Sequence, residues 1–483
     1  MTFSLTTRKL NQIAKGENYP FSTIDLERLA ISRRALLQYL ESEERSLIYG
    51  IDTGFGPHAF QNNEDRLENQ LSLVYHLSVA SDKHSLRHEE ARAVLAARIH
   101  SLCQGGSGIS TNTLALLSEL LRLDCIPLIP ERGSLSASGD LIPLAAIALA
   151  LIGESEWTGK NKSFGPTLKN GKTSKIEGLP LELAPKEALS LTNGTSFTTA
   201  LLSLQVELSS HLLSHTIEFL KILFRFHAVY ADAFLPALHE TKLHKGPVLI
   251  AKELYSIAKA NSKSKQPGER VQDIYSIRCL PHILGSIMDE IISIRETVEN
   301  ELNSLSDNPV FIESENRYVE GGNFYASHVS FAADRLQNSL AVLATWSERF
   351  IQYLYTPSEN KEFNLMLSPE PGKYAGLSGL GLLATHLTAE IRRDSMPGSV
   401  QSLSSNGGNQ DIVPMGAISV LRNRRTLDSL TSILSILGYS IFQAGHLKGI
   451  DLSTHQAFVG VRGLDVDRSL KEELKTIEKN LGI

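Results

Sequence analysis

Long segments of helical periodicity dominate the sequence and constrain its fold more than any other feature. Apolar residues recur at helical spacing over 198–230, 283–304, 325–356 and 415–446. The first of these segments carries a row of leucines at Leu201, Leu202, Leu204, Leu208, Leu212 and Leu213. The alternation typical of β-strands is scarce and confined to short stretches. We therefore predict a mainly α fold, built around a bundle of long parallel and antiparallel helices.

Shorter segments fill in the organisation between these helices. Residues 66–80 repeat Leu67, Leu71 and Val74 at helical spacing, which predicts a helix with one buried stripe. Residues 465–483 predict a charged, amphipathic closing helix. Three segments rich in Gly, Ser, Asn or Lys predict loops. They are 153–180, where a small hairpin is also open, 261–270, expected to be mobile, and 404–409, just before the last long helix.

Composition excludes several classes of protein. A hydrophobic content of 42% is that of an ordinary globular chain, and a net charge of −6 gives no electrostatic reason to expect nucleic acid. Cys103, Cys125 and Cys279 lie too far apart in sequence for a disulfide framework or a CxxC zinc site. The apolar run 141–152 contains Pro143 and is shorter than the roughly 20 residues that span a bilayer. Since the N-terminus also lacks a signal-peptide core, we expect a cytoplasmic protein that binds neither nucleic acid nor membranes.

The segment 134–141, Ser-Leu-Ser-Ala-Ser-Gly-Asp-Leu, is open to two interpretations. In the simpler one, Asp140 caps the apolar helix that follows, because its carboxylate can accept that helix's unpaired N–H groups. In the other, the amide nitrogen of Gly139 attacks the carbonyl carbon of Ala137, and glycine favours this step because no Cβ blocks the close approach. Loss of two waters would then leave an electrophilic exocyclic carbon on Ser138. From the tripeptide alone the capping interpretation is favoured.

Six further segments bear on this choice, and they occur in a fixed order over most of the chain. They are Tyr-Gly-Ile-Asp-Thr-Gly-Phe-Gly at 49–56, Leu-Thr-Asn-Gly-Thr at 191–195, Gln-Asp-Ile-Tyr-Ser-Ile-Arg-Cys at 272–279, Asp-Asn-Pro at 307–309, Gly-Asn-Phe at 322–324 and Asn-Gln-Asp at 409–411. With the tripeptide 137–139, this set resembles the aromatic amino acid ammonia-lyase and aminomutase family.

The resemblance implies a cofactor, a fold and an assembly. The cofactor is 4-methylidene-imidazol-5-one (MIO), which forms without another enzyme from Ala137, Ser138 and Gly139. The fold implied is the long helical bundle of the fumarase/aspartase-like ammonia-lyases. The assembly implied is a homotetramer in which three subunits share each active site. We expect residues 1–200 to form an N-terminal domain with the MIO loop and the Tyr49 loop, and residues 201–483 to form the bundle and the C-terminal helices.

The motifs also imply catalytic roles. Tyr49, in a glycine-rich loop, would be the base that removes a β-proton, and its phenol would need a lowered pKa. Arg278 would hold the substrate carboxylate in a bidentate fork, with Tyr275 and Gln272 orienting it. Asn193 would hydrogen-bond the imidazolone or the leaving amine. Each side chain also has a structural alternative: an aromatic loop anchor for Tyr49, a salt bridge for Arg278 and a turn residue for Asn193.

Other predicted site residues bind or pack against the substrate. Phe324 would pack over the cofactor or the substrate ring, with a core position as its alternative, and Asn323 and Gln410 would line the site. Leu77 would form an apolar wall for the substrate ring. His76 would hydrogen-bond a phenolic hydroxyl, although a histidine bonded within the protein is the alternative.

The pair His76–Leu77 favours tyrosine as the substrate. In the family, His-Leu at this position is typical of enzymes that act on tyrosine, Phe-Leu of those that act on phenylalanine, and Ser-His of histidine ammonia-lyases. A site built to bond the hydroxyl loses a partner when phenylalanine enters, so discrimination can be large. Gln410 gives a second argument against histidine, because histidine ammonia-lyases carry glutamate there. The departures from the family pattern are His58, His282 and Tyr325, and they leave the exact substrate open.

Histidine ladders and glycine-rich segments are weaker signals. Glu207, His211 and His215 share one helical face, as do His84 and His88, but core or interface roles are more frequent than metal binding on such helices. Gly376, Gly379 and Gly381 do not follow the dinucleotide-binding order. We therefore expect neither metal nor nucleotide.

The sequence thus predicts an MIO-dependent carbon–nitrogen lyase that converts an aromatic L-amino acid, preferably tyrosine, to a trans-arylacrylate such as p-coumarate. Three alternatives stay open at this point: a tyrosine or phenylalanine 2,3-aminomutase, a histidine ammonia-lyase, and a helical relative that has lost catalysis.

Overall fold

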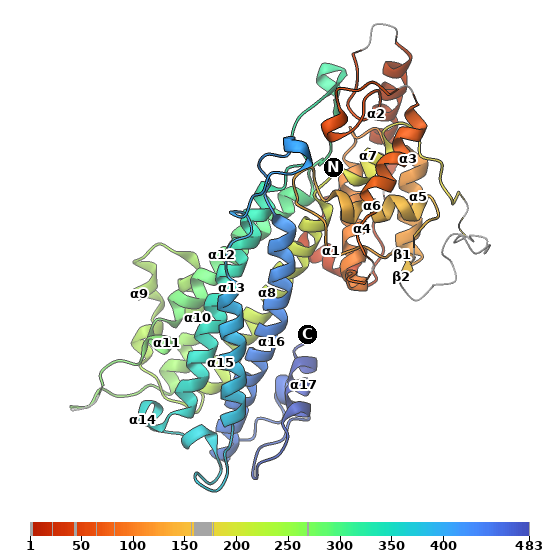
Figure 1. The fold of residues 1–483 in the computed structure, drawn as a ribbon. Helices are drawn as coiled ribbons and strands as arrows, with labels where there is room; N and C mark the ends of the chain where they lie inside the picture. Colours follow the sequence, from red (N-terminus) through yellow and green to blue (C-terminus); the bar gives the residue numbers. More distant parts are fainter. Residues whose placement is uncertain are drawn as a thin grey trace. The chain divides into compact units, whose positions relative to one another are not determined.

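The long helices predicted from periodicity are present in the computed structural model of the chain (Figure 1). They are α8 (Ser196–Phe224), α12 (Leu280–Leu302), α13 (Ser327–Tyr355) and α16 (Gly416–Leu447). The structure describes residues 3–482 except 22, 43–45, 64, 82, 156, 159–175, 177 and 268–269. Strands are short in these ranges, so the mainly α fold is confirmed.

The chain divides into two compact units, each assembled from separate segments. The first unit contains Met1–Glu207, Ile294–Asp334 and Pro397–Leu421. The second contains Leu208–Ser293, Arg335–Met396 and Arg422–Ile483. The long helices α8, α12, α13 and α16 contribute residues to both units. The predicted domains, 1–200 and 201–483, are each continuous in sequence, whereas these two units are not. The predicted domain boundary at residue 200 stays a prediction.

The first unit packs around α4 (His88–Cys103), a helix that is buried on nearly all sides after its first two residues. Its contacts are with α1 (Thr7–Ala14), α2 (Thr23–Glu41) and α5 (Thr111–Arg122). A second cluster joins α3 (Arg66–Leu77), α6 (Leu141–Leu151) and α7 (Glu187–Thr192). Two small antiparallel ladders pair β1 (Ile126–Pro127) with β2 (Trp157–Thr158) and β3 (Val310–Ile312) with β4 (Arg317–Val319). Most of the predicted loop at 153–180 lies outside the described residues.

Helix α6 directly follows the tripeptide 137–139. Its sequence is rich in Ala and Leu, which favours a helix, and Pro143 lies in the first turn, where its missing N–H costs no intrahelical bond. Apolar side chains cover the helix, so it is suited to a buried position between α3 and α7.

Helix α3 is present as predicted, but of the predicted stripe Leu67, Leu71 and Val74 only Val74 is buried. The side chains of Leu67 and Leu71 are exposed, 58% and 37%, whereas Leu73, Val74 and Leu77 are buried. Asn69 and Gln70 are buried on the same face, where they donate hydrogen bonds to backbone carbonyls of the Tyr49 loop. We infer that these polar anchors, which the apolar pattern does not count, set the orientation of the helix.

In its described part, the second unit contains helices and connecting loops but none of the strands β1–β4. Beside the long helices it contains α9 (Pro236–Glu240), α10 (Lys245–Ala260), α11 (Tyr275–Arg278), α14 (Pro357–Asn360), α15 (Ser378–Arg393) and α17 (Lys471–Asn480). The predicted loop at 261–270 is confirmed for its described residues and connects α10 to α11. The closing amphipathic helix is α17, shorter than the predicted segment.

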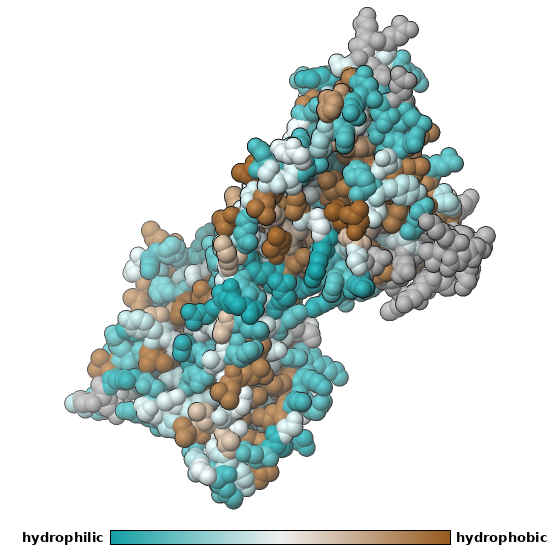
Figure 2. All heavy atoms as spheres, in the orientation of Figure 1, coloured by the Kyte–Doolittle hydropathy of each residue, from teal (hydrophilic) through white to brown (hydrophobic). Residues whose placement is uncertain are grey.

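Apolar residues interrupt the polar surface of both units, visible as brown areas in Figure 2. Large exposed side chains include Phe60, Leu67 and Phe331 in the first unit and Tyr275, Leu382 and Met396 in the second. Among the described residues, no helix combines the length and the apolar character needed to cross a membrane.

Candidate active site

A pocket in the first unit gathers most of the predicted site residues. Its volume is about 300 Å³, at the small end of ligand pockets. Tyr49, His76, Ser138, Asn193, Phe324 and Gln410 line it together with Phe55, Gly56, Ala59, Leu73, Leu141, Leu189, Asn308, Asn406 and Asn409. These residues come from segments far apart in sequence. The fold therefore brings together side chains that the sequence analysis had connected only through the order of the motifs.

The side chain of Asp140 fixes the loop that carries Ser138. The fully buried carboxylate accepts hydrogen bonds from Ser134 Oγ at 2.6 Å and from Thr198 Oγ1 at 2.7 Å. It also accepts one from the Thr198 backbone N–H at 2.9 Å. Burial raises the pKa of Asp140, and these hydrogen bonds oppose the rise. The capping prediction was therefore wrong about the helix: Asp140 lies at the N-terminus of α6, but its side chain caps α8.

Backbone contacts press Gly139 against Gly194. Gly139 has φ +70°, and a Cβ at this position would overlap the backbone of Gly194. The Asp140 N–H donates to the Gly194 carbonyl oxygen at 2.7 Å. Both positions therefore require glycine, because a side chain on Gly139 would push apart the two backbone segments that contain Gly139 and Gly194. The tripeptide 137–139 is held in a tight turn.

Ser138 itself receives two side-chain hydrogen bonds. Asn193 Nδ2 donates to the Ser138 carbonyl oxygen at 2.8 Å. Gln410 Nε2 donates to Ser138 Oγ at 2.9 Å, and the orientation of the Gln410 amide is fixed because its Oε1 accepts from Ser405 Oγ. Asn193 Oδ1 is buried and has no hydrogen-bond partner among the described residues.

Tyr49 is held by its own loop. Its hydroxyl oxygen accepts the Gly56 N–H at 2.9 Å, and its ring packs edge-on against Phe55. Its backbone N–H donates to Glu320 Oε1 at 3.1 Å. Burial raises the pKa of Tyr49, the Gly56 N–H opposes this, and the negative charge of Glu320 raises it further. The lowered pKa that the predicted role as a base requires is thus not produced by the groups around Tyr49 in one chain.

His76 lies in the last turn of α3 and lines the pocket beside Phe55. Its Nδ1 is 3.1 Å from the Ser72 carbonyl oxygen. Because a carbonyl only accepts, Nδ1 carries the proton and the Nε2 of the neutral ring is an acceptor. Leu77, the other predicted selectivity residue, is buried on α3 and is not one of the residues that line the cavity.

The Gly-Asn-Phe segment contributes one of its residues to the pocket. Phe324 lines it, whereas Asn323 is exposed and is not one of the lining residues. Of the positions that depart from the family pattern, Tyr325 follows Phe324 and its hydroxyl is 3.4 Å from the Ile412 carbonyl oxygen. His58 is exposed, next to the pocket residue Ala59.

The remaining predicted residues belong to the second unit. Arg278 Nη1 donates to Gln272 Oε1, and the guanidinium lies over the Tyr275 ring, 4.6 Å from its centroid. The Tyr275 side chain is 67% exposed. In the described structure, Arg278 Nε is buried and has no hydrogen-bond partner. His282, the third departure, packs against His239 in this unit, and burial lowers its pKa.

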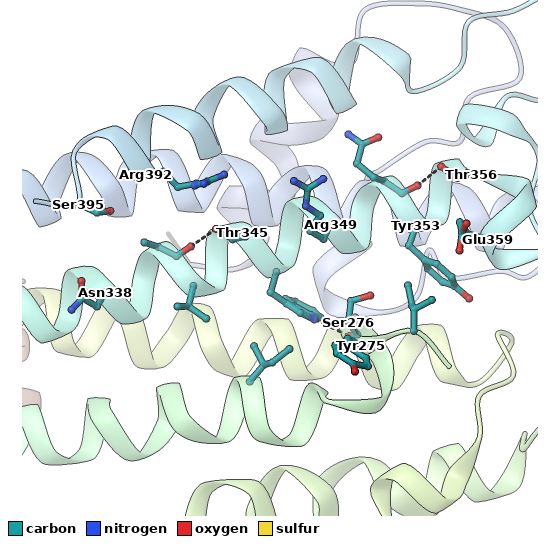
Figure 3. Close-up of a pocket in the computed structure, with 16 residues that line it drawn as sticks. Tyr275, Ser276, Asn338, Thr345, Arg349, Tyr353, Thr356, Glu359, Arg392 and Ser395 are labelled. Carbon is teal, nitrogen blue, oxygen red and sulfur yellow. Dashed lines mark hydrogen bonds between the residues drawn. The ribbon is translucent and has the colours of Figure 1, made fainter. Parts of the chain in front are cut away.

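Tyr275 also lines a large apolar pocket of about 930 Å³ in the second unit. Figure 3 shows Asn338, Thr345, Arg349 and Tyr353 along α13, with Arg392 in the last turn of α15 and Ser395 just after that helix. Across the pocket, Trp346 Nε1 donates to the Ser276 carbonyl oxygen at 2.9 Å, which fixes the segment that carries Tyr275.

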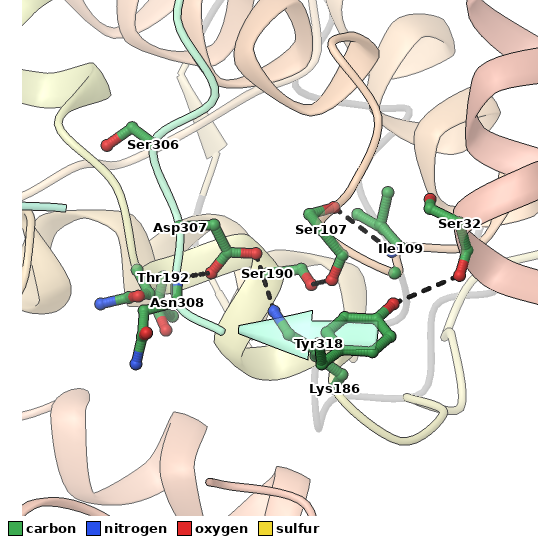
Figure 4. A network of polar contacts seen from close by, with 12 residues as sticks. Ser32, Ser107, Ile109, Lys186, Ser190, Thr192, Ser306, Asp307, Asn308 and Tyr318 are labelled. Carbon is green, nitrogen blue, oxygen red and sulfur yellow. Dashed lines mark hydrogen bonds and ion pairs between the residues drawn. The ribbon is translucent and has the colours of Figure 1, made fainter. Parts of the chain in front are cut away.

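A buried cluster of charged side chains in the first unit was not predicted from the sequence. Lys186 Nζ and Asp307 Oδ2 form an ion pair at 2.8 Å, both side chains fully buried (Figure 4). Arg98, on α4, is also fully buried, and burial lowers its pKa to about 10. An arginine between the apolar residues Ala97 and Ile99 of α4 is the signal that could have identified this cluster. Asn308, Asn406, Leu73 and Leu189 were likewise not predicted to line the site.

The histidine ladder has ordinary structural partners. Glu207 accepts from Thr7 Oγ1 at 2.7 Å and pairs with Arg295. The rings of His211 and His215 stack, and His215 Nε2 is 3.0 Å from the Leu481 carbonyl oxygen. In the part of the chain that the structure describes, no three His, Cys, Asp or Glu side chains form a group that could hold a metal ion.

Comparisons with known proteins show the family of the chain. A family model described as aromatic amino acid lyase matches residues 5–461. A tyrosine 2,3-aminomutase from Chondromyces crocatus is 33% identical over 88% of this chain and 83% of its own length. A histidine ammonia-lyase from Bacillus thuringiensis (strain Al Hakam) is 30% identical over 98% of this chain and 95% of its own. The solved structure of the Pantoea agglomerans phenylalanine aminomutase superposes with a TM-score of 0.89 at 28% identity, covering 100% of this chain and 99% of that one.

The match covers most of the chain, and the helical fold and the ordered motifs agree with it. The chain belongs to the aromatic amino acid lyase family of ammonia-lyase and aminomutase enzymes.

Proposed function

We propose that the protein is an MIO-dependent ammonia-lyase that acts on L-tyrosine and releases p-coumarate and ammonia. The observation that carries the proposal is the pair of hydrogen bonds on Ser138, from Asn193 Nδ2 and Gln410 Nε2, in a pocket that also contains Tyr49 and His76.

The loop fits the cofactor. The turn at Gly139 and its contact with Gly194 are what ring closure between the Gly139 nitrogen and the Ala137 carbonyl carbon requires. When it is formed, MIO supplies an electrophilic carbon for the substrate amine. Asn193 donates to the Ser138 carbonyl oxygen, where negative charge develops during such an addition, so it acts as an oxyanion-type donor.

Tyr49 is the candidate base for the β-proton. Its phenol must be deprotonated to act, and burial and Glu320 raise its pKa. A positive charge beyond the groups that surround Tyr49 in one chain is therefore needed near it. We propose that the guanidinium of Arg278 from another subunit supplies this charge and also binds the substrate carboxylate.

A shared site requires an oligomer, and we propose the family's homotetramer. Two features of the second unit support it. Tyr275, given a catalytic role by resemblance, is largely exposed, and the pocket beside it in Figure 3 is wide and mostly apolar. Surfaces of this kind are usually covered by a partner.

His76 supports tyrosine as the substrate. With its proton on Nδ1, the Nε2 of His76 accepts from a phenol O–H. Phenylalanine offers no such donor and would leave this acceptor unpaired. Gln410 argues against histidine, because a neutral amide committed to Ser138 and Ser405 provides no charge to hold an imidazole.

Tyrosine 2,3-aminomutase is the second candidate, favoured by the relative from Chondromyces crocatus. It shares every binding step and differs in returning the amine to Cβ before the product leaves. Histidine ammonia-lyase is third, on the strength of relatives at 30% identity and against the residues at 76 and 410.

Chromatography of products after separate incubations with L-tyrosine, L-phenylalanine and L-histidine tests the proposal. We expect p-coumarate from tyrosine, with little cinnamate or urocanate. β-Tyrosine as the main product would replace the lyase by the mutase. Urocanate would refute the roles of His76 and Gln410, and no turnover of the three would favour an inactive relative.

A further inference from the structure

Arg98 is a buried cation that the reaction outlined above does not use. It lies on α4 with no exposed surface, and it is not one of the residues that line the pocket. Burying a charge without compensation is costly, so a fully buried arginine needs several partners. Its partners explain both how it is tolerated and what it does.

The guanidinium binds backbone carbonyls on two segments at once. Nε donates to the Ser190 carbonyl oxygen at 3.1 Å, and Nη2 donates to the same oxygen and, at 3.5 Å, to that of Asn193. Nη1 donates to the Ser306 carbonyl oxygen at 3.0 Å. Asn193 and Asn308, at the ends of these two segments, both line the pocket. Only a planar fork of five N–H donors can bridge two segments in this way.

Arg98 also touches the backbone behind the tripeptide. A Cβ on Gly194 would overlap the guanidinium, and a Cβ on Gly139 would overlap Gly194. The three groups are therefore stacked in direct contact: the guanidinium, the Gly194 backbone and the Gly139 backbone. The Asp140 N–H, which donates to the Gly194 carbonyl oxygen at 2.7 Å, holds the last two together.

Two buried carboxylates compensate the charge. Asp307, paired with Lys186, and Asp140 both interact favourably with Arg98. Figure 4 shows Lys186 and Asp307 facing each other beside Ser190 and Ser306, the residues whose carbonyl oxygens Arg98 binds. The backbone segments at Ser190 and Ser306, which Arg98 binds, therefore also lie beside the Lys186–Asp307 ion pair.

We propose that Arg98 is a positioning residue for cofactor formation: it presses Asn193–Gly194 onto Ala137–Ser138–Gly139 so that the ring can close. This rests on the proposed MIO function. In the reaction, a bond forms between the Gly139 nitrogen and the Ala137 carbonyl carbon. One water leaves with the Ala137 carbonyl oxygen and the amide hydrogens of Ser138 and Gly139, so a C=N bond forms between the Ala137 carbon and the Ser138 nitrogen. A second water leaves with the Ser138 hydroxyl and the Ser138 α-hydrogen. The mature chain is lighter by about 36 Da, with no oxidant involved.

Arg92 provides a matched control. It lies on the same helix, is 3% exposed, and donates to the Ile13 and Leu121 carbonyl oxygens and to Asp124. Arg98→Lys and Arg92→Lys therefore each replace a buried guanidinium on the same helix by an ammonium group. Only Arg98→Lys changes the contact with Gly194.

The experiment compares intact masses of the full-length parent and both variants at fixed times after synthesis, together with circular dichroism and thermal unfolding midpoints. We expect the parent and Arg98→Lys to fold, but dehydration to be at least about tenfold slower in Arg98→Lys, because small displacements of reacting atoms cost one to two orders of magnitude. Arg92→Lys should dehydrate like the parent.

Equal dehydration of Arg98→Lys and Arg92→Lys would overturn the proposal. If Arg98→Lys is insoluble, Arg98→Gln, which buries no charge, decides by the same measurement. Failure of both to fold while Arg92→Lys folds would assign Arg98 to stability and would also overturn it. A parent that never loses the two waters would refute the proposed function, and that result is distinct from each of these.

Discussion

Replacing Asn193 by alanine separates the chemistry of the pocket from its stability. In folding terms, the variant loses the hydrogen bond to the Ser138 carbonyl oxygen, a net loss of about 1 kcal/mol for a typical buried bond. It also removes the buried, unpartnered Oδ1, and leaving such an atom unpaired costs about 1–3 kcal/mol. The two terms oppose each other, so we expect the free energy of unfolding to change by no more than about 1–2 kcal/mol.

The catalytic effect should be much larger. Asn193 Nδ2 lies 2.8 Å from the oxygen on which negative charge develops, and the Asn193 side chain is only 3% exposed. Loss of one such donor costs about 2.7–4 kcal/mol of transition-state stabilisation, a factor of about 10²–10³ in kcat. The assay follows arylacrylate absorbance in purified variant and parent, with intact mass measured on the same samples to confirm that both have lost the two waters.

A fall in kcat of less than about tenfold in a fully dehydrated variant would refute the oxyanion role. So would an activity loss that merely follows the unfolded fraction, because Asn193 would then act through stability.

Three further perturbations test other parts of the site. Glu320→Gln keeps an acceptor for the Tyr49 N–H but removes a charge that raises the pKa of Tyr49, so the acidic limb of the kcat/KM pH profile should move to lower pH. The control Glu315→Gln, at another exposed glutamate, should leave that limb in place. An unmoved limb in Glu320→Gln would contradict the role of Tyr49 as base. His76→Phe removes the Nε2 acceptor and should lower kcat/KM for tyrosine relative to phenylalanine by roughly 10–100-fold, a ratio obtained from competition between the two substrates; an unchanged ratio would exclude His76 from selectivity. Arg278→Lys retains the charge but loses the fork, so KM should rise more than kcat falls, and equal kinetics to the parent would remove Arg278 from carboxylate binding.

Periodicity was sufficient to predict the long helices. Their leucine-rich spacing corresponds to α8, α12, α13 and α16, with ends shifted by a few residues. The same argument failed for the face of α3, because Asn69 and Gln70 bind the Tyr49 loop and turn Leu67 and Leu71 outward. Hydrophobic pattern alone carries no information about which backbone groups a buried amide will bind.

The pocket was predictable only where motifs named its residues. Ser138, Asn193 and Gln410 were expected in the site, and Asn193 and Gln410 each donate a hydrogen bond to Ser138. The capping role of Asp140 could not be foreseen, because Thr198 is nearly sixty residues away in sequence. Arg98 shows the same limit: it binds carbonyl groups, which every residue has, so no side-chain pattern marks its partners.

The central claim is that Ser138 is converted into the electrophile that the reaction needs. The most direct measurement is the intact mass of the parent and of Ser138→Ala, with tyrosine turnover assayed in the same two samples. We predict a parent that is lighter by two waters and active, and a Ser138→Ala protein at its full calculated mass that is inactive. Turnover by Ser138→Ala, or by a parent at its full calculated mass, would contradict the account.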